Sequence, residues 1–131
     1  MKRIFLALML SCVALSASAP AQRRAAKDPC RDPQSQAEMN ICAREKFKAA
    51  DAELNRVYNR LVSLLADNEG QRGKLKTAET AWLKYRDDNC EYEASFFDGG
   101  SMRPLILSSC FERMTKARTA ELRGQIKELN Q

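Results

Sequence analysis

The chain has 131 residues, which is enough for one small domain with a modest hydrophobic core. Its 22 basic and 17 acidic residues give a formal net charge of +5, but the two signs are interleaved along the sequence instead of forming a basic block. Nucleic-acid binding requires a continuous basic face, so we predict no nucleic-acid partner. The chain has no histidine and lacks the commonest general base, so we also predict that it is not an enzyme.

The first 21 residues have the form of a secretory signal peptide. Two bases precede an apolar run from residue 4 to residue 15, which is too short to span a bilayer, and small residues follow it. Cleavage near Ala21 would remove two of the 22 bases and none of the 17 acids, which lowers the net charge from +5 to +3. We therefore predict a periplasmic or secreted protein. Lipid attachment at Cys12 is the weaker alternative, because the residues before it match the usual lipobox poorly.

Residues 22–34 contain two prolines and several charges, and we predict that they form an irregular lead-in. Ser35 lies three residues before Glu38, a capping-box pattern that opens a helix. Apolar residues then recur at steps of three and four, which predicts a helix over about 35–66 with one apolar stripe. The stripe consists of Phe47, Ala50, Leu54, Val57, Leu61 and Leu64.

Two further helices are predicted, over about 69–97 and 103–129. The first carries a stripe of Leu75, Ala78, Trp82, Tyr85, Asn89 and Tyr92. It should end before a Gly-Gly pair, after which Ser101 is a candidate cap and Pro104 suits a first helical turn. The second carries Leu107, Phe111, Met114, Arg118, Leu122, Ile126 and Leu129. With no useful β-alternation, the sequence predicts an all-α protein, a small antiparallel three-helix bundle forming a single domain over 35–131.

Four cysteines remain after signal cleavage: Cys30, Cys42, Cys90 and Cys110. An even number in a small exported chain predicts two disulfides, and antiparallel helices place all four at one end of the bundle. The pairs Cys30 with Cys42 and Cys90 with Cys110 are preferred, but three connectivities are open, since Cys42 also falls level with Cys90. The long spacings and the absence of histidine disfavour a zinc site, and we predict no metal and no cofactor.

Several polar and aromatic residues lie on or beside the apolar stripes: Asn55, Tyr58, Trp82, Arg86 and Arg118. We interpret them as structural, forming a buried or half-buried network that fixes the register of the helices, with Arg86 packed on Trp82. Phe47, Tyr58, Trp82 and Tyr85 are interpreted as core rather than as a ligand-binding box.

The loop between the second and third helices is the candidate partner-binding site. It contains Asp98, Gly99, Gly100, Ser101 and Arg103. One interpretation is a compact connection in which the glycines allow a tight turn. The other is a rigid binding tip, because a loop held by a disulfide loses less entropy when it binds a partner.

Several motifs occur in a fixed order: C-RDPQSQAEMN-ICA, ADAELNRVYNRL, AWLKYRDDNC, and EA with GGS and a final cysteine before MTKARTAEL. In this respect the chain resembles the LprI-like lysozyme inhibitor family of small exported bacterial proteins, over about residues 28–122. The resemblance implies an all-helical, disulfide-bonded envelope protein that binds and inhibits animal-type lysozyme. The matching positions are Cys30, Gln36, Met39, Asn40, Cys42, Asp51, Leu54, Asn55, Tyr58, Trp82, Arg86, Cys90, Gly99, Gly100, Cys110, Arg118 and Leu122.

Two functional hypotheses follow, each with a protein partner, no membrane span and no predicted oligomeric state. In the first, Ser101 and Arg103 donate hydrogen bonds to the two catalytic carboxyl groups in the lysozyme cleft. Animal-type lysozymes are generally basic, so a partner of net charge +3 would be repelled at long range, which is an objection to this hypothesis. In the second, the chain is a periplasmic interaction module that binds another envelope component and does not inhibit lysozyme.

Overall fold

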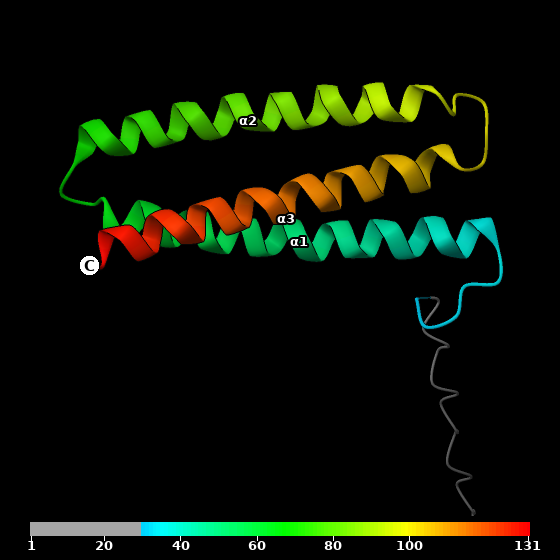
Figure 1. The fold of residues 1–131 in the computed structure, drawn as a ribbon, viewed down its shortest axis with the longest axis horizontal. Helices are drawn as coiled ribbons and strands as arrows, with labels where there is room; N and C mark the ends of the chain where they lie inside the picture. Colours follow the sequence, from blue (N-terminus) through cyan, green and yellow to red (C-terminus); the bar gives the residue numbers. More distant parts are fainter. Residues whose placement is uncertain (1–29) are drawn as a thin grey trace, which may run out of the picture.

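The protein consists of three long α-helices joined by two turns, in a computed structural model that describes residues 30–131 (Figure 1). Helix α1 spans Gln36–Leu64, α2 spans Glu69–Ser95 and α3 spans Arg103–Leu129. No strand occurs within the described residues, and the predicted all-α class is confirmed. The predicted signal peptide, Cys12 and the first part of the lead-in lie outside the described residues.

The helix starts follow the local sequence. Ser35 caps α1 by accepting a hydrogen bond at Oγ from the Glu38 N–H, at 3.2 Å. The Asn68 side chain caps α2 by accepting from the Gln71 N–H, at 3.0 Å. The cap position of α3 is Met102, with no side-chain cap hydrogen bond, so the expectation that Ser101 caps this helix is wrong. Proline in the first turn favours this start, because its missing N–H is not needed there.

The helices form an elongated bundle in which α1 and α3 run in the same direction and α2 runs opposite to both (Figure 1). α3 packs closely along α1, and α2 lies against α3 with a wider separation. The start of α1, the end of α2 and the start of α3 meet at one end, which we call the disulfide end. The α1–α2 turn and the end of α3 meet at the other, which we call the open end.

An aliphatic cluster forms the core of the half nearer the open end. Its buried members are Leu54, Val57, Leu61, Leu65, Leu75 and Leu122, with Tyr58, Val62, Trp82 and Ile126 packed against them. Each fully buried leucine contributes roughly 1.5–3 kcal/mol relative to an exposed one. The apolar stripe predicted for the first helix supplies three of these residues, so α1 is oriented as its periodicity indicates. Within the described residues, no helix is long and apolar enough to cross a membrane.

The buried face of α2 differs from its predicted stripe. Tyr85 is 61% exposed and Tyr92 is 63% exposed, and Ala78 is also exposed. The residues that face the bundle are Leu75, Glu79, Arg86, Cys90 and Ala94. The prediction that Tyr85 belongs to the core is therefore wrong. The physical reason is that two charged side chains occupy the buried face of α2 and find partners there, which a purely apolar periodicity does not reveal.

Candidate functional site

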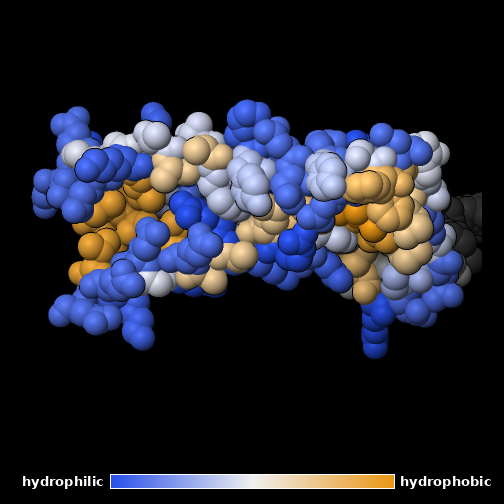
Figure 2. Space-filling view, turned by 45° about the horizontal axis from the view of Figure 1, so that its top comes forward, coloured by the Kyte–Doolittle hydropathy of each residue, from blue (hydrophilic) through white to orange (hydrophobic). Residues whose placement is uncertain are grey.

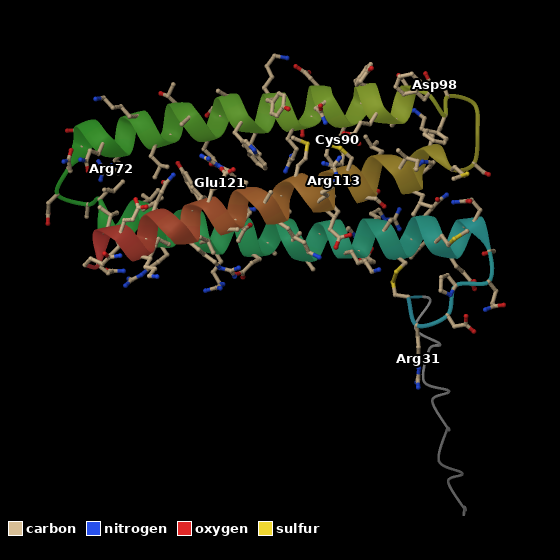
Figure 3. All side chains as sticks on the ribbon, viewed as in Figure 1. Arg31, Arg72, Cys90, Asp98, Arg113 and Glu121 are labelled. Carbon is tan, nitrogen blue, oxygen red and sulfur yellow. A yellow bond between two sulfur atoms is a disulfide. The ribbon has the colours of Figure 1, made fainter. Side chains whose placement is uncertain are left out.

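Two disulfides cross-link the disulfide end. Cys30 is bonded to Cys42, which fastens the lead-in to α1, and Cys90 is bonded to Cys110, which joins α2 to α3. These are the preferred pairs, and they are confirmed. The sulfurs of Cys90 and Cys110 lie 3.6 and 3.9 Å from the Met114 Sδ, and Cys90 has no exposed surface (Figure 3). The disulfide between α2 and α3 is therefore buried in the bundle.

The loop after α2 is held in place by its backbone. Gly99 has a φ of 76°, a conformation that side-chain-bearing residues avoid. The Gly100 N–H donates to the Phe97 carbonyl at 3.0 Å, and a Cβ at Gly100 would lie 3.2 Å from that oxygen. The Asn40 Nδ2 donates to the Ser101 carbonyl at 3.0 Å, which ties the loop to α1. Both glycines of the sequence pattern thus serve a compact, hydrogen-bonded turn.

Arg103 forms an ion-pair triad at this loop. Its Nε donates to Asp98 Oδ1 at 2.6 Å and its Nη2 donates to Glu91 Oε2 at 2.5 Å. The hydrogen bond to Asp98, followed by that to Glu91, raises the pKa of Arg103. A carboxylate on a partner would therefore have to compete with two carboxylates of this chain for the guanidinium. The Asp98 side chain is labelled at the α2 end of the loop in Figure 3.

Large apolar side chains gather on the surface of the disulfide end. Phe96 is 72% exposed, Tyr92 63%, Met102 43%, Ile41 40% and Phe97 37%. We call these five residues the tip surface. An apolar patch is visible near this end of the molecule in Figure 2. Single exposed apolar residues are ordinary, but five of them at one end of a small bundle make that end a candidate interaction site.

Sequence reasoning missed the tip surface. Tyr92 was assigned to the buried stripe of α2, and the loop was judged by its polar residues alone. One signal was present in the sequence: Phe96, Phe97 and Met102 immediately flank a Gly-Gly turn, where the helices end and little core remains to cover large side chains. Clustered apolar residues beside a helix-ending turn are therefore candidates for a surface patch.

Arg86 lies at the centre of a mixed polar and aromatic cluster. Its guanidinium pairs with Asp87 at 2.9 Å and with Asp51 of α1 at 3.3 Å, and it donates to the buried Thr115 Oγ1 of α3 at 3.3 Å. Its Cζ lies 5.5, 5.4 and 5.3 Å from the ring centroids of Phe47, Trp82 and Phe111. One side chain of α2 therefore contacts both other helices, as a register-fixing residue would.

Arg118 and Asn55, two of the other residues predicted to be structural, lie close to the Arg86 cluster. Arg118 pairs with Glu79 at 3.0 Å and with Glu121 at 2.9 Å, and its Cζ lies 5.8 Å from the Trp82 ring centroid. Asn55 is exposed, so the prediction that it is buried or half-buried is wrong. Its Nδ2 donates to the Asp51 backbone carbonyl at 2.9 Å and to the Asp51 Oδ2 at 3.2 Å, so it supports the acid that pairs with Arg86. The described part of the chain contains no buried side-chain nitrogen or oxygen without a hydrogen-bond partner, so these polar residues are internally satisfied.

The open end carries a cleft of about 510 Å³ between the helices. Leu61, Leu65, Leu75, Ala78 and Leu129 form its apolar walls, and Gln71, Lys74, Arg118, Gln125 and Glu128 line the rest. In Figure 2 an apolar, hollowed area is visible at the end opposite the tip surface. No group of three or more metal-binding side chains lies together in residues 30–131.

The family model described as lysozyme inhibitor LprI matches residues 26–122, which include all four paired cysteines and the Gly-Gly loop. An uncharacterized protein of Rhizobium meliloti (strain 1021) is 37% identical over 129 residues, covering 90% of this chain and 89% of that protein. A crystal structure of a DUF1311 family protein from Pseudomonas putida KT2440 has a TM-score of 0.62 and 24% identity, covering 66% of this chain and 89% of the other.

The structural likeness shows that the helical fold is shared. The relative from Rhizobium meliloti extends the sequence similarity over nearly the whole of both chains. The family match covers the three helices as far as Leu122 of α3 and contains both disulfides and the tip surface. This chain belongs to the lysozyme inhibitor LprI family.

Proposed function

We propose that the protein is an exported inhibitor of animal-type lysozyme that acts by binding the enzyme with its disulfide end. Lysozyme inhibition is the role that the family description carries. The observation that carries the proposal is the tip surface, in which five large apolar side chains are exposed beside a cross-linked loop. An end that is already rigid loses little conformational entropy on binding.

Export is part of the same proposal. A disulfide between Cys90 and Cys110 requires an oxidising compartment, and both sulfurs are built into the packing of α2 on α3. A chain of this size depends strongly on such a link, since each closure is worth roughly 3 kcal/mol in the chain-entropy model. The apolar N-terminal run supplies the route out of the cytoplasm in this proposal.

The loop residues retain a role at this surface. Ser101 is exposed, and Arg103 is one-third exposed at its side chain, so both reach a docked partner. Since Arg103 also orders Asp98 and Glu91, its removal would disturb the loop as well as any contact with the enzyme. A matched control is Arg113, which lies at the same end and pairs with Glu93 across α2 and α3 at 2.9 Å (Figure 3).

The test is hydrolysis of cell walls by a basic animal-type lysozyme, titrated with the oxidised chain from Gln22 to Gln131. Saturable inhibition by the oxidised protein, lost on reduction, is the expected result. Ser101→Ala with Arg103→Ala should weaken inhibition, and Arg113→Ala should leave it close to wild type. If the folded, oxidised protein does not inhibit even in large molar excess, the inhibitor proposal is wrong and the periplasmic interaction module replaces it.

A further inference from the structure

One side of α2 presents aromatic rings to solvent. Tyr85, Tyr92 and Phe96 are separated by seven and four residues, which places them in line along one helix face. They are 61%, 63% and 72% exposed. The rings of Tyr92 and Phe96 contact each other edge to face, with centroids 5.3 Å apart. We call these three residues the aromatic face of α2.

The charge beside the aromatic face is negative although the whole chain is positive. Residues 87–98 contain five acidic residues and no basic residue. Asp88 pairs with Lys84 at 2.7 Å and Glu93 pairs with Arg113 at 2.9 Å, while the side chains of Asp88 and Glu91 remain 65% and 53% exposed. Arg103 is shared between Glu91 and Asp98, so this triad keeps one uncompensated negative charge. Arg86 is likewise shared between Asp51 and Asp87.

Helix stability does not account for this placement. The C-terminal end of a helix carries a partial negative charge and favours nearby cations. The last turn of α2 contains Glu93 and no basic residue, and Glu91 lies just before it. The acids therefore lie at the end of α2 where the macrodipole disfavours them.

Resting on the proposed function, we propose that the aromatic face of α2 is the contact surface for a cationic protein, here the basic surface of lysozyme. Lysine or arginine side chains of the partner stack on Tyr85, Tyr92 and Phe96 and pair with the flanking Asp88 and Glu91. Rings supply cation–π attraction and buried area, and carboxylates supply charge-assisted hydrogen bonds. Local complementarity of this kind offsets the repulsion that the net charge of +3 after signal cleavage predicts at long range.

The aromatic face also fits the inhibitor better than the cleft at the open end does. The cleft is lined by Lys74 and Arg118 together with Glu128, and three more bases, Arg60, Arg72 and Lys76, occur in the segments that flank the α1–α2 turn. Asp67 and Glu69 also flank that turn, and Arg118 is paired with Glu79 and Glu121, so this mixed region offers a basic partner less attraction than the acidic end of α2 does. The two ends of α2 thus differ in sign, and the acidic end is the one that carries the exposed rings.

The test uses the full oxidised chain and measures its affinity for a basic animal-type lysozyme by titration calorimetry. Tyr92→Ser with Phe96→Ser should lower the affinity by at least about tenfold, as expected for aromatic residues at the centre of an interface. The matched control is Leu129→Ser, a 51% exposed apolar residue at the other end, which should leave affinity within about twofold. Circular dichroism confirms that each variant is folded.

Charge is tested separately. Raising the salt concentration from about 0.05 M to about 0.3 M should weaken wild-type binding, and Asp88→Asn with Glu91→Gln should weaken binding and flatten that dependence. If wild-type protein binds lysozyme and the aromatic variant binds equally well, the aromatic face is not the contact and the inference is overturned while the inhibitor function stands.

Failure of the inhibitor function itself gives a different pattern. If wild-type protein does not bind lysozyme, cytochrome c and its lysine-acetylated form serve as cationic and neutralised probes. Binding to the cationic form alone, lost in the aromatic variant, supports the inference; binding to neither overturns it. Concentration-dependent sedimentation that disappears in the aromatic variant would show that a second copy covers this face, which also overturns the inference.

Discussion

The two ends of the bundle are stabilised by different physics. At the open end the helices meet through leucines, and the aliphatic core reaches the surface as a cleft. At the disulfide end the same helices meet through a buried disulfide, a buried arginine and ion pairs beside the half-buried Phe47 and Phe111, and five other large apolar side chains are exposed. Covalent and polar links therefore replace apolar burial at the end where apolar side chains are exposed to solvent.

Helix α2 produces this difference. Its buried face begins with Leu75 and continues with Glu79, Arg86, Cys90 and Ala94, so apolar bulk decreases along the helix. Small and polar residues facing inward leave the aromatic side chains of the second half free to face outward. A binding surface of exposed rings is compatible with a folded chain because the bond between Cys90 and Cys110 holds α2 in place.

The largest predicted loss of stability comes from a substitution in the core at the open end. Leu122 has no exposed surface and packs among leucines of α1 and α2, so Leu122→Ala should lower the free energy of unfolding by about 3–5 kcal/mol. Half-buried Leu107, on α3 near the disulfide end, is the matched position, and Leu107→Ala should cost clearly less. Urea unfolding of the oxidised proteins measures both. Equal losses would contradict a core concentrated at the open end.

The second largest predicted loss of stability comes from removing a disulfide at the disulfide end. Replacing Cys90 and Cys110 together by alanine should cost about 3 kcal/mol, because the bond closes a span of 20 residues and its sulfurs are packed in the bundle. Replacing Cys30 and Cys42 should cost less, since that bond holds only the lead-in against α1. Guanidinium unfolding without reductant gives the ranking. A reversed ranking would mean that the lead-in supports the bundle more than its contacts indicate.

Alanine substitutions at two glycines, one near each end of the bundle, should change the stability in opposite directions. Gly99 has a φ of 76°, so Gly99→Ala at the disulfide end should destabilise the protein by about 1–2 kcal/mol. Gly73 lies inside α2 near the open end, and a Cβ there would meet nothing within 4 Å. Gly73→Ala should therefore stabilise by about 0.5–1 kcal/mol. Thermal unfolding distinguishes the signs, and two changes of the same sign would contradict the backbone argument.

The smallest effect depends on pH. The hydrogen bond from Arg113, helped by Asn89 and opposed by burial, holds the pKa of Glu93 below 4.5. Well above pH 4.5 the carboxylate is charged in the folded and unfolded chains, and its contribution is complete. As the pH falls below that value, the unfolded chain binds the proton first, so stability is lost on acidification. Glu93→Gln should reduce the slope of Tm against pH in this range; parallel profiles would contradict the assignment.

The sequence predicts the class of fold because the relevant signals are local. The periodicity of α1, the Ser35 cap and the Gly-Gly break are each readable within a few residues, and the even number of cysteines limits the cross-links. The orientation of α2 is not readable in this way. Its inward face carries Glu79 and Arg86, and only tertiary contacts with Arg118, Asp51 and Thr115 make their burial favourable.

In the candidate site too, local features are predictable from the sequence and tertiary contacts are not. The glycines of the loop were singled out for their conformational freedom, and Gly99 uses it. Arg103 was singled out as a donor for a partner, and in the folded chain it is engaged by Glu91 and Asp98. Because Glu91 lies 12 residues away along the chain, this pairing depends on the approach of α2 and α3. The exposed rings are not predicted, because the apolar periodicity of α2 assigns the wrong face of this helix to the core.

Because the bundle has three helices and successive helices run in opposite directions, it begins and ends at opposite ends of the molecule. α1 begins beside the tip surface and α3 ends at the open end, so Gln36 and Leu129 are separated in space by about the length of one helix, which is about 40 Å for the 27 residues of α3. A tether attached ahead of α1 would hold the exposed rings against whatever the tether is fixed to. A tether attached beyond α3 would turn the rings outward. Immobilisation through the C-terminal end is thus the orientation that leaves the tip surface accessible.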